Sequence, residues 1–341
     1  MGAPAVKLPK LCALLWFVAA LVGCQPRHAV TDVQTIRIAI HRDRIAFLPV
    51  YLARTLGYDR QEGIAVEPSE LAGGTKAIEA MLGGSADVAA GSMSDAIALA
   101  AEGRPVRGFL LVYARPSEAL AVAPAHGSAI RTIRDLKGHT VGVTAPGSAS
   151  HQFLNFLLVK NGLAPEDVST VSVGMSSTSI SALEHAQVDA AVLLASAIPT
   201  FELRNPANAF LADTRTPSGA RQVFGSEGFP ALSLLAETEW LEHNADAAQR
   251  LVRAIKNAMR WVREQPVERV REMIPADARM TPAEADFRAI REVQAAMSTD
   301  GIVPPGSAAI VERFVAVSDP RVRAAKIDPE QIYTNQFAVE R

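Results

Sequence analysis

The sequence predicts an α/β protein built as two similar lobes, and two observations lead to this fold class. Short apolar runs alternate with segments of helical periodicity along most of the chain, which is typical of βαβ units and largely parallel sheets. One unit, at residues 75–89, returns with the same spacing at residues 177–191. A repeat of this kind favours two similar lobes over one long sheet.

The first series of units begins with an alternating strand near the N-terminus of the body. Ser92, with Asp95 three residues later, is close to a capping box in which Asp replaces the usual Glu, so a helix is expected to begin there. Strands are expected at residues 36–40, 64–67, 87–90 and 110–114, and helices at residues 47–56, from residue 73 and from residue 92.

The second series begins near Ile133 and contains the repeated unit. In both copies a hydroxyl residue, Thr75 or Ser177, opens a helix with matched apolar positions, and Asp87 or Asp189 then opens a buried strand. The alternative is a chance likeness, because βαβ units share period and capping chemistry. Further strands are expected at residues 140–144 and 168–173, with a helix after residue 148.

The apolar run at residues 229–235 is expected to return the chain to the first lobe, and the remainder is strongly helical. Helices are expected at residues 237–264, ended by Pro266, and at residues 282–297 and 305–317. We therefore expect a first lobe of residues 33–122 with 224–341, which carries a helical C-terminal extension, and a second lobe of residues 123–223.

The N-terminus has the pattern of an export signal. Lys7 and Lys10 precede an apolar run at residues 11–22 that is too short to span a bilayer. The tetrapeptide Leu21-Val22-Gly23-Cys24 resembles the bacterial lipobox, which implies cleavage after residue 23 and lipid on Cys24, whereas the alternative is an ordinary secretory signal. Residues 24–34 then form a tether. Cys12 would leave with the signal and Cys24 would carry lipid, so no disulfide is expected.

Three segments resemble the nitrate, sulfonate, taurine and thiamine-precursor solute-binding proteins of ABC importers. Residues 46–58 (AFLPVYLARTLGY) with 62–66 (EGIAV) resemble the start of that family, and residues 133–143 (IRDLKGHTVGV) with 146–148 (PGS) resemble the entry to its second lobe. The turn at residues 187–191 (QVDAA) is also similar. The resemblance implies a two-lobed periplasmic-binding-protein fold, type II-like, which holds a ligand in the cleft between the lobes.

Four helix starts are expected to converge at the carboxyl ends of the strands, where open α/β sheets bind ligands. Their N–H groups and hydroxyls favour an anionic or polar group, although Ser and Thr at helix starts are also ordinary caps. The candidate ligand-binding residues at these starts are Gly74, Thr75, Ser92, Met93, Ser94, Ser148, Ser150, Ser176, Ser177 and Thr178.

Four more candidates lie elsewhere: Arg42, Phe47, Arg115 and Ser196. Arg42, or Arg44 two residues later, could clamp a carboxylate or sulfonate, or belong to a solvated turn. Arg115 could be a pocket charge or a surface residue. Phe47 could stack on a planar ligand or belong to the core. Ser196 stands where the family often has an acid and a proline, which weighs against an amine or pyrimidine ligand. Because donors outnumber acceptors around these loops, we expect a small organic anion such as a sulfonate or carboxylate.

The remaining composition excludes several function classes. A formal net charge of −2 gives no basic footprint for nucleic acid. No metal-binding histidine pair, nucleophile elbow or phosphate-binding loop occurs, and His151 is the best candidate base, so we expect neither an enzyme nor a cofactor or metal. We expect a monomeric, lipid-anchored, extracytoplasmic protein whose partners are a small ligand and the permease and ATPase subunits of an importer. A sensory or accessory lipoprotein, and a protein that binds a pyrimidine-type thiamine precursor, stay as alternatives, and an enzyme of the same fold is a less favoured one.

Overall fold

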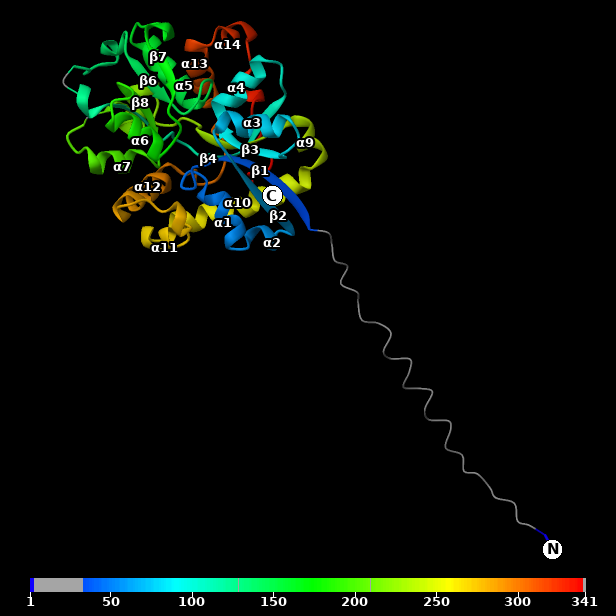
Figure 1. Ribbon diagram of the computed structural model, residues 1–341. Helices are drawn as coiled ribbons and strands as arrows, with labels where there is room; N and C mark the ends of the chain where they lie inside the picture. The colour runs from blue at the N-terminus through cyan, green and yellow to red at the C-terminus, as the bar shows by residue number, and fades with distance from the viewer. Residues whose placement is uncertain (3–32, 128, 209, 340–341) are drawn as a thin grey trace. The chain divides into compact units, whose positions relative to one another are not determined.

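The computed structural model describes residues 1–2, 33–127, 129–208 and 210–339. Residues 34–341 form one compact unit that contains two five-stranded sheets with helices around them (Figure 1). The predicted signal peptide and Cys24 lie outside the described residues, as does most of the predicted tether. No helix in the described part of the chain has both the length and the apolar character that a membrane crossing requires.

The first sheet has the strand order β2-β1-β3-β10-β4. β1 runs parallel to β2 and β3, whereas β10 runs antiparallel to β3 and β4. Its strands are β1 (Gln34–His41), β2 (Ile64–Leu71), β3 (Val88–Ser92), β4 (Val106–Tyr113) and β10 (Leu232–Glu237), and its helices are α1 (Leu48–Thr55), α2 (Tyr58–Gln61), α3 (Gly74–Leu82) and α4 (Met93–Ala101).

The second sheet has the order β7-β6-β8-β5-β9, which copies the first strand for strand. β6 runs parallel to β7 and β8, and β5 runs antiparallel to β8 and β9. Its strands are β5 (Glu118–Val122), β6 (Thr140–Val143), β7 (Ser169–Ser172), β8 (Ala190–Leu194) and β9 (Phe210–Asp213), and its helices are α5 (Ala149–Lys160), α6 (Ser177–Glu184), α7 (Ile198–Arg204) and α8 (Pro217–Phe224).

One strand lies in a different sheet from the one expected. Residues 118–122, assigned from the sequence to the first lobe, form β5 and pair with β8 and β9 of the second sheet. The strand is short, and its partners are distant in sequence, so its own pattern does not reveal which sheet it joins. β10 is its counterpart, and it enters the first sheet as the apolar run at residues 229–235 predicts.

The repeated unit is also repeated at the level of contacts. Asp87 accepts a hydrogen bond from the backbone N–H of Arg37 at 2.8 Å, and Asp189 accepts one from the backbone N–H of Thr140 at 2.8 Å. In each sheet the Asp before the central strand, β3 or β8, thereby fastens that strand to its neighbour, β1 or β6. The two similar α/β units predicted from the sequence are therefore confirmed.

The C-terminal helices contact elements of both sheets. α10 packs against α1, α12 packs against α7, and α13 packs against both α4 and α5. The helix predicted at residues 237–264 is divided at Asn244, whose side chain donates to the carbonyl of Trp240 at 3.0 Å and ends the first piece. The helices are α9 (Thr238–His243), α10 (Ala245–Glu264), α11 (Val267–Glu272), α12 (Ala283–Ala296), α13 (Ala308–Ser318) and α14 (Pro320–Ala325).

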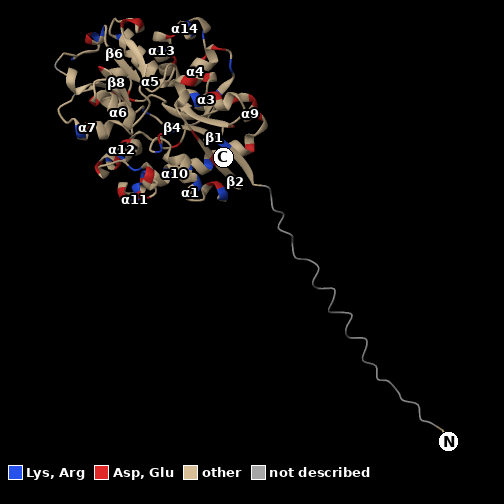
Figure 2. Cartoon of the chain, viewed as in Figure 1, with Lys and Arg blue, Asp and Glu red and all other residues tan. Residues whose placement is uncertain are grey.

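Charged residues of both signs are interspersed over the outer helices (Figure 2). The interior is apolar, with Ile38 of β1, Leu52 of α1 and Ile255 of α10 all buried in one core cluster. A second cluster includes Phe314 of α13 and Phe156 of α5, whose ring centroids are 4.9 Å apart. This second core joins helices from around both sheets and thus frames the space between them.

Candidate ligand-binding site

A cavity of about 150 Å³ lies where strands of both sheets end. Its wall includes His41 at the end of β1, Ser92 at the end of β3, Thr144 just after β6 and Leu194 at the end of β8. These are the carboxyl ends of parallel strands, which is the general location of ligand sites in open α/β sheets. The cavity therefore lies where the sequence predicts the ligand-binding site.

Seven of the fourteen candidate ligand residues line this cavity. Three of the four predicted helix starts contribute to the wall, those of α3, α4 and α5. The lining candidates are Gly74, Thr75, Ser92, Ser94, Arg115, Ser148 and Ser150.

Two apolar candidates belong to the core instead. Phe47 is 1% exposed and packs the edge of its ring against His41, with centroids 4.5 Å apart. Met93 is fully buried beneath the first sheet, where its sulfur closely approaches Gly108. Neither side chain lines the cavity, because each lies at a helix start and packs into a hydrophobic core cluster.

The remaining five candidates lie beside the cavity or on the surface. Arg42, Ser177 and Thr178 are exposed, and Thr178 uses its hydroxyl to bond the carbonyl of Met175 at 2.8 Å. Ser176 and Ser196 share a hydrogen bond of 2.9 Å next to the wall. Ser196 also donates to Asp43 at 2.7 Å and so links the loop after β8 to the loop after β1.

Two of the lining hydroxyls, those of Ser92 and Ser148, also cap the helices that present them. Ser148 accepts from the backbone N–H of His151 at 3.4 Å as the N-cap of α5. Ser92 and Asp95 form the predicted capping box, with the Ser92 N–H donating to Asp95 at 3.0 Å. The same serines thus serve as helix caps and as part of the cavity wall, which are the two roles that the sequence predicts for them.

Seven polar wall residues were not among the candidates: His41, Asp43, Asp95, Tyr113, Ser117, Glu118 and Thr144. The Tyr113 hydroxyl and the His41 Nδ1 are buried and have no hydrogen-bond partner within the described part of the chain. Tyr113 and Glu118 flank the crossing from β4 to β5. Tyr113 ends β4 and Glu118 begins β5. The sequence could have identified both as site residues if the crossing to the second lobe had been placed before residue 118 and not after residue 122.

Burial shifts the proton affinity of these wall groups. It raises the pKa of Glu118 to about 7, with the charge of Asp95 as a second cause. It raises the pKa of Asp95 to about 6, although the hydrogen bond from the Ser92 backbone acts in the opposite direction. It also raises the pKa of Tyr113 and lowers that of His41. Each of these shifts favours the uncharged form.

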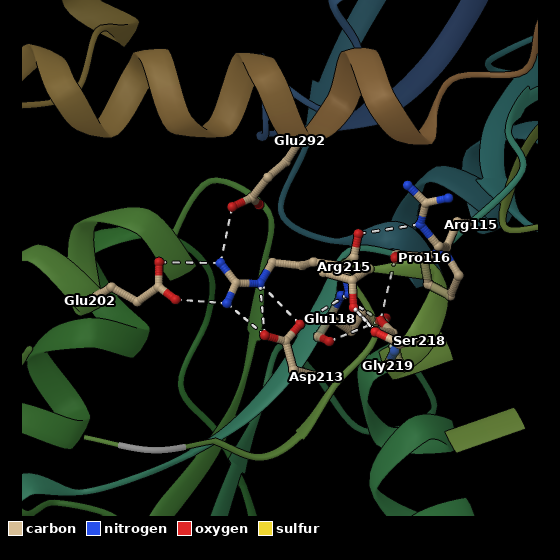
Figure 3. A network of polar contacts seen from close by, with 11 residues as sticks. Arg115, Pro116, Glu118, Glu202, Asp213, Arg215, Ser218, Gly219 and Glu292 are labelled. Carbon is tan, nitrogen blue, oxygen red and sulfur yellow. Dashed lines mark hydrogen bonds and ion pairs between the residues drawn. The ribbon is translucent and has the colours of Figure 1, made fainter. Parts of the chain in front are cut away.

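Arg115 is the cationic side chain of the wall, and its guanidinium bonds backbone carbonyls. Its Nε donates to the carbonyl of Arg215 at 3.2 Å (Figure 3), and its Nη2 donates to that of Ala295 at 3.0 Å. Arg44 faces elsewhere, since it pairs with Glu70 at 2.9 Å. Asp43 and Asp95 were expected near these loops, and Glu118, the first residue of β5, adds a third acid to a wall with one arginine.

The rest of the wall is apolar and aromatic. Phe224 at the end of α8 and Phe229 before β10 have ring centroids 4.3 Å apart, and both pack against Phe314. Leu232 and Val293 extend this wall. A ligand with a small apolar body and one or two polar groups matches such a lining.

Two sheets of identical strand order, with a cavity between their strand ends, define the class of the periplasmic binding proteins. The structure is similar to the alkanesulfonate-binding protein SsuA from Xanthomonas axonopodis pv. citri bound to MOPS, with a TM-score of 0.66 and 19% identity over 87% of this chain and 95% of that one. A likeness at this identity establishes the shared fold, and the fold predicted from the sequence is confirmed.

The chain belongs to the NMT1/THI5-like family, whose model matches residues 44–269. A solved protein from Bordetella bronchiseptica RB50 is similar at a TM-score of 0.84 and 31% identity, over 89% of this chain and 95% of that chain. The 4-amino-5-hydroxymethyl-2-methylpyrimidine phosphate synthase of Schizosaccharomyces pombe is 32% identical over 133 residues, which are 38% of this chain and 36% of that enzyme. The chain thus matches only about a third of that relative.

Proposed function

We propose that this protein is the extracytoplasmic solute-binding component of an ABC importer, held at the membrane by lipid on Cys24. It captures a small organic solute in the cavity between the two sheets and delivers it to a permease. The observation that carries the proposal is the cavity itself, which combines a mostly apolar lining with polar groups that have no partner in the described structure, among them the Tyr113 hydroxyl.

An anionic group on this solute is supported by Arg115. The guanidinium has five N–H donors, and its Nε and Nη2 are held by the carbonyls of Arg215 and Ala295. These two bonds orient the side chain at the wall, so the remaining donors are available to a carboxylate or sulfonate. The similarity to an alkanesulfonate-binding protein agrees with this chemistry.

A binding role is favoured over catalysis by the state of the best candidate base. His151 accepts a hydrogen bond from the backbone N–H of Gly147 at 2.9 Å and is not among the cavity residues. Burial lowers its pKa. The chain's two cysteines, Cys12 and Cys24, are both assigned to the N-terminal segment that export would remove or modify.

A thermal-shift screen of the mature protein against sulfonates, carboxylates, nitrate and pyrimidines tests capture, because a ligand that binds the native state raises the unfolding midpoint. We expect at least one compound to raise the midpoint and to compact the protein in small-angle scattering. Compaction is expected because we propose that the two lobes close over the bound solute, and binding without compaction would contradict this closure. No binding by any compound would contradict this choice of solute classes. For the anchor, Cys24→Ser should release the protein from membranes or leave its signal uncleaved, and a wild type without acyl mass would refute the lipoprotein assignment.

A further inference from the structure

Two acidic side chains face the cavity without a cation beside them. Asp95 belongs to the first turn of α4, and Glu118 is the first residue of β5, so the two sheets each contribute one. Within the described residues neither takes part in an ion pair, and the Glu118 carboxylate accepts no hydrogen bond from the protein, whereas Asp95 accepts the one from the Ser92 backbone. Each charge also raises the free energy of the other, since Asp95 contributes to the raised pKa of Glu118.

The nearest cation of the wall does not neutralise them. Arg115 donates to the carbonyls of Arg215 (Figure 3) and Ala295, and within the described residues it forms no ion pair with Asp95 or Glu118. Asp43, the third acid of the wall, is satisfied within the protein by the Ser196 hydroxyl at 2.7 Å and the Ala46 N–H at 3.2 Å. The unmet demand for a hydrogen-bond donor is therefore concentrated on Asp95 and Glu118.

An independent observation indicates that a polar ligand completes the same cavity. Tyr113 is 6% exposed and lines the cavity, and its hydroxyl has no partner in the described structure. A buried hydroxyl without a partner costs about 1–3 kcal/mol of desolvation, which a polar ligand would recover. The cavity lining also includes Phe224, Phe229 and Phe314, whose rings suit an apolar body and attract a nearby cation.

We propose that Asp95 and Glu118 bind a positively charged N–H group of the solute, an ammonium or amidinium carried on a small apolar or aromatic body. The inference rests on the proposed solute-binding function and adds a cationic group to the anionic one assigned to Arg115, so that the solute carries both charges.

Four compounds on one aromatic body separate the charges: 4-(aminomethyl)benzoate, benzylamine, benzoate and benzyl alcohol. Calorimetric titration of the mature protein at pH 8 is expected to give the tightest binding for 4-(aminomethyl)benzoate, with benzylamine tighter than benzoate or benzyl alcohol. Glu118→Gln and Asp95→Asn should each weaken the two amine-bearing compounds by about tenfold or more, since hydrogen bonds to charged groups contribute about 1.5–3 kcal/mol. The exposed Glu268→Gln in α11 is the matched control and should change nothing.

Benzoate binding tighter than benzylamine, or binding that tightens in Glu118→Gln, would mean that the acids act as neutral donors to an anion and would overturn the inference while leaving solute capture intact. Failure of all four compounds would overturn it too, because the aromatic ammonium is its defining probe, and the wider screen would then judge solute capture separately. If Asp95→Asn disturbs the cap of α4, Glu118→Gln still decides, since its side chain has no bond to the protein to lose.

Discussion

Glu118 and Asp95 are acids that the fold holds in an unfavourable place. Ionisation of a carboxyl at a buried position without a cation costs free energy in the folded chain and none in the unfolded chain. The pKa of Glu118 is accordingly raised to about 7 and that of Asp95 to about 6. A folded state that retains protons longer than the unfolded state becomes less stable as pH rises through this window.

This linkage predicts how Glu118→Gln changes the ligand-free protein. Below about pH 4 the carboxyl is neutral in both states, so its ionisation has no effect on stability; from there to about pH 7 the wild type progressively loses stability. The amide cannot ionise. The midpoint of the variant relative to the wild type is therefore expected to be higher at pH 8 than at pH 5, as measured by thermal unfolding. A difference that is equal at the two pH values would show that Glu118 is not desolvated.

Single residues could be predicted where their partners are close in sequence. Ser92 and Asp95 are three residues apart, and the capping box predicted for them is present. Phe47 and Met93, by contrast, are candidate ligand contacts that lie in the core. Whether a residue at a helix start faces the core or the cavity depends on how that helix packs on the sheet, which its local sequence does not specify. Glu118 was missed because its importance comes from α4 and the second sheet, which the local sequence does not specify.

At the scale of elements, the helix starts combine capping with recognition. Ser148 caps α5, since it accepts from the N–H of His151 at 3.4 Å, and it also lines the cavity. Thr216 caps α8 in the same manner, since it accepts from the N–H of Gly219 at 3.1 Å, but it lies outside the cavity lining. A comparison of Ser148 with Thr216 therefore separates helix capping from ligand contact as roles of a hydroxyl at a helix start.

Ser148→Ala and Thr216→Ala are expected to lower the free energy of unfolding by about 1 kcal/mol each, which is the usual cost of a lost cap. Only Ser148→Ala should also weaken binding of an anionic hit from the screen, by roughly 1–3 kcal/mol if the hydroxyl contacts the charged group. Urea denaturation and calorimetry measure the two effects. Equal affinity in both variants would show that Ser148 is a cap and nothing more.

The elements themselves were well predicted by the sequence because βαβ units carry local signals. Most of the strands, the four helix starts and the repeated Asp before the central strand follow from periodicity and turn residues, whereas no strand was expected at β5 or β9. What the pattern missed were non-local or side-chain events. β5 crosses to the other sheet on long-range pairing alone, and the division at Asn244 depends on one side chain that bonds the preceding turn.

At the scale of the whole body, α12 is tied to the second sheet by Arg215. The side chain of Arg215 is 12% exposed and contacts Asp213 of β9 at 2.6 Å, Glu202 of α7 at 2.7 Å and Glu292 of α12 at 3.0 Å (Figure 3). Burial raises the pKa of Glu292 to about 7 even with Arg215 beside it. The same helix contributes Val293 to the cavity wall, so this ion network and the ligand site share a support.

Arg215→Ala is therefore expected to do more than remove one contact. It leaves three carboxylates near one another without their cation, and breaking a buried network of this kind costs about 3 kcal/mol or more. Because the repulsion falls as the acids take up protons, the loss of unfolding free energy should be larger at pH 8 than at pH 5. Arg221→Ala is the control, since its pair with Glu227 is exposed and its loss should change stability by less than about 0.5 kcal/mol.

If the network also holds α12 against α7, small-angle scattering of the ligand-free Arg215→Ala variant will show a larger radius of gyration than the wild type. Equal radii combined with the expected loss of stability would mean that the network stabilises the second sheet and its helices without restraining the position of α12.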